Sequence, residues 1–363
     1  LFPPFRLCGS GLPVIMGASF AHVPLLIALG AQFGMPTILG AQLAGGFVAI
    51  LVGLFYNKLS KIFTPLVTGT VVFTIRFSLY PTAITYMAVG SGAPDFGSVK
   101  NWALAIFTLV IVTFFNYFTK GICKMATILI GIVCGYLAAL ALGMISFESI
   151  GEASWFQFTP PLYFGMKFDI TAIISMAIMF VVGSLEIMGD FTSTAGGGLN
   201  RPVQSEEMSG GIIGNGIISI IDSLFGGLPT ATFSQNVGIV IMTKVVNRVV
   251  LGLAAVIIVL AGLIPKFSAL LTTVPSCVLG GATVSVFAMI AMTGIKLVVK
   301  EGLNTRNTAV VGLSVALGIG VIQVADCFAQ FPEWAKTIFG TSPVVIATLT
   351  AVTLNLLLPK DLD

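Results

Sequence analysis

Two carboxylates lie four residues apart within an otherwise apolar part of the chain, at Glu186 and Asp190. This spacing places both side chains on one face of a helix. A carboxylate inside an apolar span costs about 2.5–3.5 kcal/mol and marks a functional site by default. Because burial disfavours the charged form, such a group can bind and release a proton as its surroundings change. We predict this role for Glu186; the alternatives are a structural ion pair for Glu186 and a solvated position for Asp190.

A second polar cluster interrupts a later apolar stretch, at Gln235 and Asn236, and is followed by Gly238. Two adjacent amides in an apolar span are costly unless their donors and acceptors are used. A planar heterocycle with alternating C=O and N–H groups would pair with an amide, which offers both a donor and an acceptor. We expect Gly238 to allow a close backbone approach and to begin a half-helix whose positive end points at the site. The alternative is that these amides bond between helices.

The composition excludes a soluble protein. Hydrophobic residues make up 56% of the 363 residues, charged residues make up 9%, and the mean hydropathy is +1.06. A soluble domain holds about 25% charged residues, so the surface must face a lipid bilayer. One histidine and five scattered cysteines indicate no metal site, no cofactor other than a coupling proton, and no catalytic residues. No basic cluster is dense enough for nucleic acid, and a channel would need rings of like charge or carbonyl filters.

The chain is expected to cross the membrane as an all-α bundle of about twelve segments. These are expected near residues 12–30, 36–56, 62–80, 102–118, 125–146, 170–190, 209–225, 229–243, 247–265, 278–296, 307–324 and 341–359. If residues 1–10 are cytoplasmic, twelve of the 17 basic residues fall on the inside and four on the outside, as the positive-inside rule predicts. Arg76 lies within a span, where we expect it to reach the head groups, with a role in a gate as the alternative.

Two short motifs recur along the chain. Residues 11–13 (Gly-Leu-Pro) reappear at 227–229, and a Gly-Thr-Val-Val-Phe run at 69–73 is echoed at 281–287, both about 215 residues later. An odd number of spans separates the copies, so the two halves should insert with opposite polarity. Inverted repeats with interrupted helices at corresponding positions are typical of transporters. We expect a parent of seven plus seven spans of which this chain lacks the first two, with short extended segments at 14–21 and 230–236.

The run from Gln235 to Lys244 resembles the signature of the nucleobase–ascorbate transporter family. That signature is Gln, Glu or Pro, then Asn-x-Gly, four residues, and Thr followed by Arg, Lys or Gly. Its fixed positions are Gln235, Asn236, Gly238, Thr243 and Lys244. Residues 184–190 resemble the family's eighth span and residues 9–20 its third. Residues 279–282 and 303–304 resemble stretches around its twelfth and thirteenth spans. The resemblance implies fourteen spans in a core and a gate domain, and elevator-like, proton-coupled uptake of nucleobases.

The resemblance also implies which residues bind the substrate. These are Glu186, Gln235, Phe20, Ala21, Phe233 and Ser234. Glu186 and Asp190 are also the expected proton-coupling residues, and Asp190 matches a further polar position on the same span. Gln rather than Glu at position 235 favours xanthine or uric acid over uracil. His22 and Asn215 are candidates for the border of the pocket; a hydrogen-bonded structural role is the alternative for His22.

The expected core domain comprises residues 1–57 and 166–265, and the expected gate domain comprises residues 58–165 and 266–363. The prediction is therefore a multi-pass protein of the bacterial cytoplasmic membrane that carries a purine base and forms a homodimer, as the resemblance implies. The alternatives are a carrier of uracil or another nucleobase, and an anion exchanger or sensor on the same fold.

Overall fold

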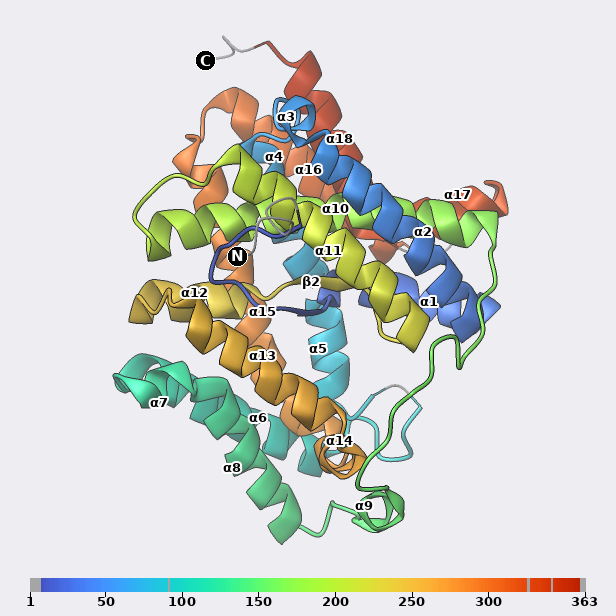
Figure 1. The fold of residues 1–363 in the computed structure, drawn as a ribbon, viewed down its shortest axis with the longest axis vertical. Helices are drawn as coiled ribbons and strands as arrows, with labels where there is room; N and C mark the ends of the chain where they lie inside the picture. The colour runs from blue at the N-terminus through green and yellow to red at the C-terminus, as the bar shows by residue number, and fades with distance from the viewer. Residues whose placement is uncertain (1–7, 91, 325–326, 341, 360–363) are drawn as a thin grey trace. The chain divides into compact units, whose positions relative to one another are not determined.

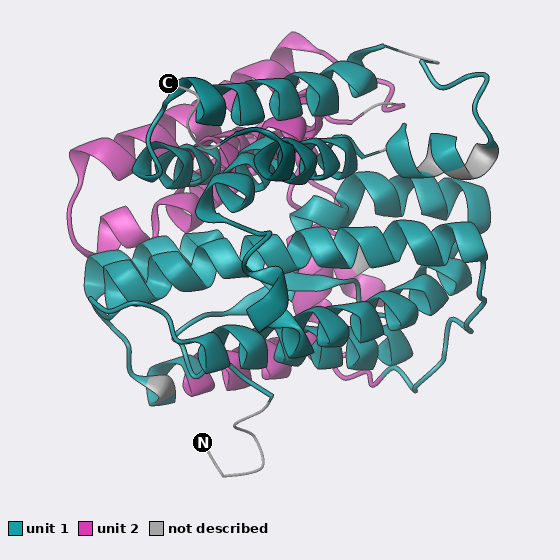
Figure 2. Ribbon diagram, turned by 90° about the horizontal axis from the view of Figure 1, so that it is seen from above, with its two compact units in different colours: residues 1–76, 159–251, 290–363 teal, residues 77–158, 252–289 magenta. Residues whose placement is uncertain are grey.

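The structure is a computed structural model that consists mostly of helices. It describes residues 8–90, 92–324, 327–340 and 342–359. The chain divides into two compact units (Figure 2). Unit 1 comprises Leu1–Arg76, Thr159–Leu251 and Ile290–Asp363, and unit 2 comprises Phe77–Phe158 and Gly252–Met289. The expected core and gate domains are defined by motion rather than by compactness, so that assignment stays a prediction.

Unit 1 holds both short strands and the longest helix (Figure 1). Its elements are β1 (Met16–Ala18), η2 (Phe20–His22), α1 (Val23–Phe33), α2 (Met35–Leu54), α3 (Tyr56–Leu59), α10 (Ile170–Gly198), α11 (Ser205–Phe225), β2 (Thr230–Thr232), α12 (Ser234–Thr243), α16 (Thr305–Gln323), α17 (Glu333–Phe339) and α18 (Pro343–Leu357). Unit 2 holds α5 (Tyr80–Met87), α6 (Val99–Phe118), α7 (Ile122–Met125), α8 (Thr127–Ala141), α9 (Glu148–Glu152) and α14 (Pro265–Thr272). Three of the four boundaries between the units fall within α4 (Pro65–Ser78), α13 (Arg248–Gly262) and α15 (Ser276–Lys300), and the fourth, after Phe158, falls between α9 and α10.

Six of the described helices are long and apolar enough to cross a membrane: α2, α6, α10, α11, α15 and α16. Val249–Gly262 and Pro265–Thr272 add a seventh crossing if this pair, bent by 87°, is one span. Each segment expected from the sequence overlaps a helix or a strand followed by a helix, so the all-α membrane fold is confirmed. Fewer helices than expected are this long, because several expected spans form shorter helices: α8 and α18 have 15 residues each, and α1 and α12, which have 11 and 10, follow the extended segments.

The two strands pair with each other although more than half of the chain separates them. β1 and β2 run antiparallel, with Met16 opposite Thr232 and Ala18 opposite Thr230. The ladder continues past both ends, where Ser19 N donates to Pro229 O at 2.8 Å and Phe233 N donates to Ile15 O at 3.0 Å. Each strand follows one copy of the Gly-Leu-Pro motif and precedes a helix. This pairing confirms that the chain is extended after both copies of the repeated motif. The extended segments are shorter than the expected 14–21 and 230–236, because η2 begins at Phe20 and α12 begins at Ser234.

Glycines allow α2 and α11 to approach until their backbones touch. A Cβ added to Gly46 would lie 2.9 Å from Gly216 O, and one added to Gly216 would lie 2.6 Å from Gly46 O. At the other end of the contact, Ser209 Oγ donates to Gly53 O at 2.7 Å. Small residues favour such packing in a bilayer, where apolar side chains gain little by leaving lipid. The two helices therefore form a rigid support for β2, which follows α11.

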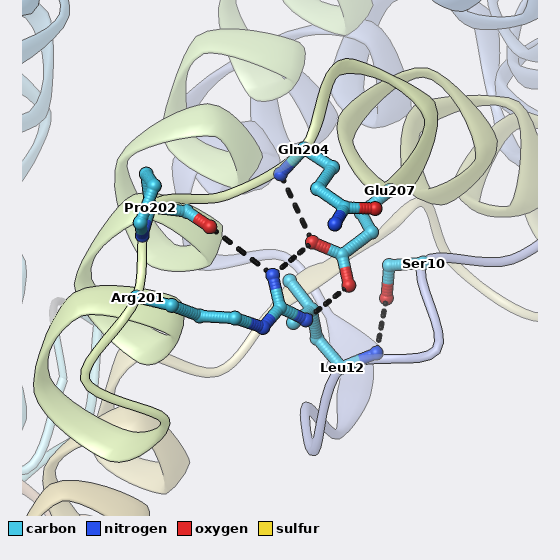
Figure 3. A network of polar contacts seen from close by, with 6 residues as sticks. All are labelled: Ser10, Leu12, Arg201, Pro202, Gln204 and Glu207. Atoms are coloured by element: carbon cyan, nitrogen blue, oxygen red, sulfur yellow. Dashed lines mark hydrogen bonds and ion pairs between the residues drawn. The ribbon is translucent and has the colours of Figure 1, made fainter.

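An ion pair and a capping box fix the start of α11 (Figure 3). Arg201 donates to both oxygens of Glu207, at 2.8 and 2.5 Å, while Glu207 also accepts from Gln204 N at 3.0 Å. The hydrogen bonds to Glu207 raise the pKa of Arg201, which lies outside the spans. This network sets the turn between α10 and α11.

Candidate functional site

The middle of α10 is enclosed by protein on every face. Asp169 is the N-cap of this helix, and its carboxylate accepts from Thr171 N at 2.9 Å and Ala172 N at 3.0 Å. All residues from Val182 to Phe191 are buried. Because lipid and solvent are both excluded there, the polar side chains of this stretch must find their partners within the protein.

Glu186 forms an ion pair with Arg76 of α4, although both residues lie within apolar helices. Arg76 Nη2 contacts Glu186 Oε1, and the side chains of Arg76 and Glu186 are 4% and 2% exposed. Apart from this ion pair, neither Glu186 oxygen nor Arg76 Nε has a hydrogen-bond partner among the residues that the structure describes. We expected Arg76 to reach the head groups, and that expectation is wrong. The buried carboxylate compensates the guanidinium, so Arg76 does not need water.

Asp190 lies one turn after Glu186 on α10 and binds the second extended segment, at the junction of β2 and α12. Its carboxylate accepts from Thr232 Oγ1 at 2.5 Å and from Ser234 Oγ at 2.8 and 3.0 Å. The side chain is buried, so the solvated alternative for Asp190 is wrong. Hydrogen bonds to a carboxylate are stronger than those between neutral groups. Asp190 therefore fixes the end of β2 and the start of α12 beside Glu186.

The strands bring the expected substrate-binding segments together at Gly17 and Phe233. A Cβ added to Gly17 would lie 2.4 Å from Phe233 Cζ, so the ring packs directly on the backbone of the first segment. Beyond β1, Ala21 is buried and the Phe20 side chain is 37% exposed. The register places Phe20 and Ala21 beyond one end of the ladder, after the Ser19–Pro229 bond, and Phe233 and Ser234 at the other end, where Phe233 N donates to Ile15 O. The contact of these four residues with substrate stays a prediction.

The two adjacent amides have different surroundings. Asn236 is buried, and its Oδ1 accepts from Ile15 N at 3.0 Å, which ties α12 to the residue before β1. Gln235 is half-buried, and the structure records no hydrogen bond of its amide to any described residue. Asn236 therefore has a structural role in joining the segments, while the donor and acceptor of Gln235 are free for a ligand.

Two expectations about Gly238 are wrong. A Cβ added there would meet no described atom within 4 Å, so no backbone approaches closely. The half-helix α12 begins at Ser234 rather than at Gly238, because Phe233 is the last extended residue. The positive end of the half-helix still points at the crossing, one turn earlier than expected.

The last residues of the signature close α12. Thr243 Oγ1 donates to Ile239 O at 2.8 Å. Lys244 has a φ of 56° and is the C-cap of the helix, and its Nζ contacts Gly197 O and lies 3.5 Å from Asn200 Oδ1. Thr243 and Lys244 therefore end α12 and tie it to the end of α10.

His22 and Asn215 lie in different surroundings. His22 is buried against Phe180 of α10, with ring centroids 5.2 Å apart, and neither ring nitrogen has a hydrogen-bond partner among the described residues. The hydrogen-bonded alternative for His22 is therefore wrong. Asn215 Oδ1 accepts from Thr230 Oγ1 at 3.2 Å and supports β2. A place at the border of the pocket stays a prediction for both residues.

Known proteins are similar to this chain in sequence over almost its whole length. A sequence profile of the permease family matches residues 4–327. The xanthine permease of Bacillus subtilis (strain 168) is 38% identical over 97% of this chain and 80% of its own length. The uric acid permease PucJ of the same organism is 39% identical over 96% of this chain and 79% of its own. The chain belongs to this permease family. The resemblance to nucleobase–ascorbate transporters is thereby confirmed.

Solved structures share the fold of this permease. The transmembrane domain of the cyanobacterial bicarbonate transporter BicA matches 96% of this chain and 87% of its own, with a TM-score of 0.57 and 15% identity. SLC26A9 matches 95% of this chain and 57% of its own, with a TM-score of 0.63 and 11% identity. The fold is therefore the seven-plus-seven inverted-repeat plan, and this permease is a multi-pass transporter of the cell membrane rather than an enzyme.

Sequence reasoning missed the partner of the central carboxylate of this permease. Arg76 and Glu186 lie 110 positions apart in the sequence, and nothing in their spacing indicates contact. The available signal was charge: a basic and an acidic residue, each costly in lipid, occur in two different spans. Thr232 was also missed, because a threonine in an apolar stretch most often bonds to its own helix.

Proposed function

We propose that this permease takes up an oxidised purine, xanthine or uric acid, together with a proton. The observation that supports it is the crossing of β1 and β2 beside Glu186, where the Gln235 amide has no partner among the described residues. Gln235 can donate to a ring carbonyl and accept from a ring N–H, which suits the edge of an oxidised purine. The names of the curated relatives, a xanthine and a uric acid permease, agree with this choice.

The proposed coupling uses Glu186 as the group that binds and releases the proton. A carboxylate that accepts no hydrogen bond other than its ion pair responds strongly to a change in its surroundings. Substrate entry next to Glu186 would provide that change. No cofactor other than the coupling proton is part of the proposal.

The proposed movement is an elevator in which a core domain (residues 1–57 and 166–265) carries the site past a gate domain (residues 58–165 and 266–363). The inverted repeat supports it, because two halves of similar fold and opposite polarity can exchange conformations and so open the site to each side of the membrane in turn. A homodimer would anchor the gate domains. Chemical cross-linking in native membranes tests the dimer, and monomers alone would contradict it.

Uptake into proteoliposomes tests the proposed function. Labelled xanthine should accumulate when the outside is acidic, and unlabelled uric acid should compete while uracil should not. Glu206→Gln serves as the matched control for Glu186→Gln, because Glu206 is an exposed glutamate in the first turn of α11. Competition by uracil as strong as that by uric acid would favour the general nucleobase carrier instead.

A further inference from the structure

The ion pair at the centre of the site places a positive charge where the proposed substrate binds. Arg76 is the only lysine or arginine that is buried in the described part of the chain. Its neighbours on α4 do not share the charge, because Thr70 and Thr74 donate to carbonyls of their own helix. Asp190 is a second carboxylate within electrostatic reach of Arg76. A guanidinium so enclosed must always have an anionic partner.

Asp190 is held in place by more hydrogen bonds than Glu186. Its oxygens already accept from Thr232 and Ser234, and these bonds hold β2 and α12. Glu186 has only the ion pair among the described residues, and Arg76 Nε is unused. A structural ion pair would be expected to use its remaining donors and acceptors. The pair is therefore suited to exchange one anion for another.

We propose that Arg76 determines specificity by binding the anionic form of an oxidised purine. This proposal rests on the proposed function. The planar guanidinium offers two parallel N–H donors, which match the N–C–O edge of a purine monoanion as they match a carboxylate. When the anion takes this place, Glu186 leaves the ion pair and takes up one proton from solution. One negative charge enters the site and one is neutralised, so the charge of the site is unchanged.

The exchange answers an objection to an anionic substrate. Glu186 alone would repel an anion, but a protonated Glu186 can donate a hydrogen bond to it, and Arg76 supplies the counter-charge. The other titratable or charged groups that face Glu186 are Asp190 on α10 and His22, whose ring Cε1 lies 3.5 Å from the position of a Cβ added to Gly183. The site therefore couples proton uptake to anion binding through a single ion pair.

Binding to the purified full chain in detergent tests the proposal with two probes. Urate is an anion at neutral pH, and hypoxanthine is neutral. In Arg76→Gln, urate affinity should fall by about tenfold or more, while hypoxanthine affinity changes little. Arg76→Lys should retain part of the urate affinity, because it keeps the charge but not the planar fork. In Glu186→Gln, urate should bind at least as tightly as in the parent. The parent should bind urate more weakly at alkaline pH, because its Glu186 must take up a proton, and Glu186→Gln should not show this weakening.

The double variant Arg76→Gln/Glu186→Gln keeps the test decisive if Arg76→Gln alone does not fold, because it leaves no unpaired charge. It should show the same loss of preference for urate over hypoxanthine. Arg306→Gln is the matched control, because Arg306 donates to carbonyls at the C-terminal end of α18, those of Asn355 and Leu358, and its loss should not affect that preference.

Equal weakening of both probes in Arg76→Gln, or a double variant that keeps the preference of the parent for urate, would overturn the proposal. Both outcomes leave purine transport itself intact. If the unchanged protein binds neither urate nor xanthine, the proposed function fails, and this proposal fails with it.

Discussion

Asp190 accepts a hydrogen bond from Thr232 Oγ1 at 2.5 Å, across 42 positions of the sequence. The bond joins the long helix α10 to the strand β2 at the point where the chain stops being extended and becomes α12. Ser234, the first residue of α12, donates to the same carboxylate. One side chain thus sets the position of the second broken segment relative to Glu186.

Asp190→Ala should destabilise the protein, because the Thr232 and Ser234 hydroxyls would lose their acceptor inside the protein. Buried unpaired groups cost about 1–3 kcal/mol, and thermal unfolding in detergent measures the loss. Thr272→Val is the control, since among the described residues the exposed Thr272 hydroxyl bonds only to Ala269 O of its own helix. Equal shifts in Tm for the two variants would show that the Asp190 network is not a structural link.

Glu186→Gln should abolish the accumulation of substrate driven by a pH gradient while some binding remains. Glutamine keeps the shape and hydrogen-bonding capacity of glutamate but cannot release a proton. Glu186→Ala should also weaken the binding of a neutral purine, because it removes the hydrogen-bonding side chain and leaves a void. Uptake by proteoliposomes with and without the gradient measures both effects. Accumulation by Glu186→Gln at the level of the parent would move coupling to another group, with Asp190 as the first candidate.

Gln235→Glu should weaken the binding of xanthine by about tenfold or more, because a carboxylate lacks the N–H donor and repels ring carbonyls. The Tm should change little, since Gln235 is half-buried. Asn236→Ala provides the contrast: it removes the acceptor of Ile15 N and should lower the Tm. Unchanged xanthine affinity in Gln235→Glu would remove this residue from the contact with substrate.

Two glycines of the broken segments should respond in opposite ways to alanine. Gly17→Ala should lower the Tm, because the new Cβ would collide with the Phe233 ring. Gly238→Ala meets no described atom within 4 Å and lies inside α12, where alanine is favoured over glycine by about 0.5–1 kcal/mol. It should therefore raise the Tm. A large loss of stability in Gly238→Ala would reveal a close approach that the structure does not show.

The sequence alone determined the class of the protein and the places where its helices break. The chain has too few charged residues for a surface that faces water, so its surface must face the bilayer. Within lipid, this sequence pattern is compatible only with helices. The repeated Gly-Leu-Pro motif located both extended segments, because each copy marks where helical residues give way to poor helix formers. Glu186 could be identified because a carboxylate within an apolar span is energetically costly, and a short stretch of sequence is enough to show it.

The tertiary structure decided which polar groups are already paired and which are free. Arg76 and Glu186 meet only because α4 and α10 pack together, and a one-dimensional pattern holds no distance between two spans. Gln235 and Asn236 look equivalent in the sequence, but the register of β1 with β2 brings Ile15 N to Asn236 alone. Hydrogen bonds and ion pairs are short-range and directional, so their assignment depends on how the segments lie together in space.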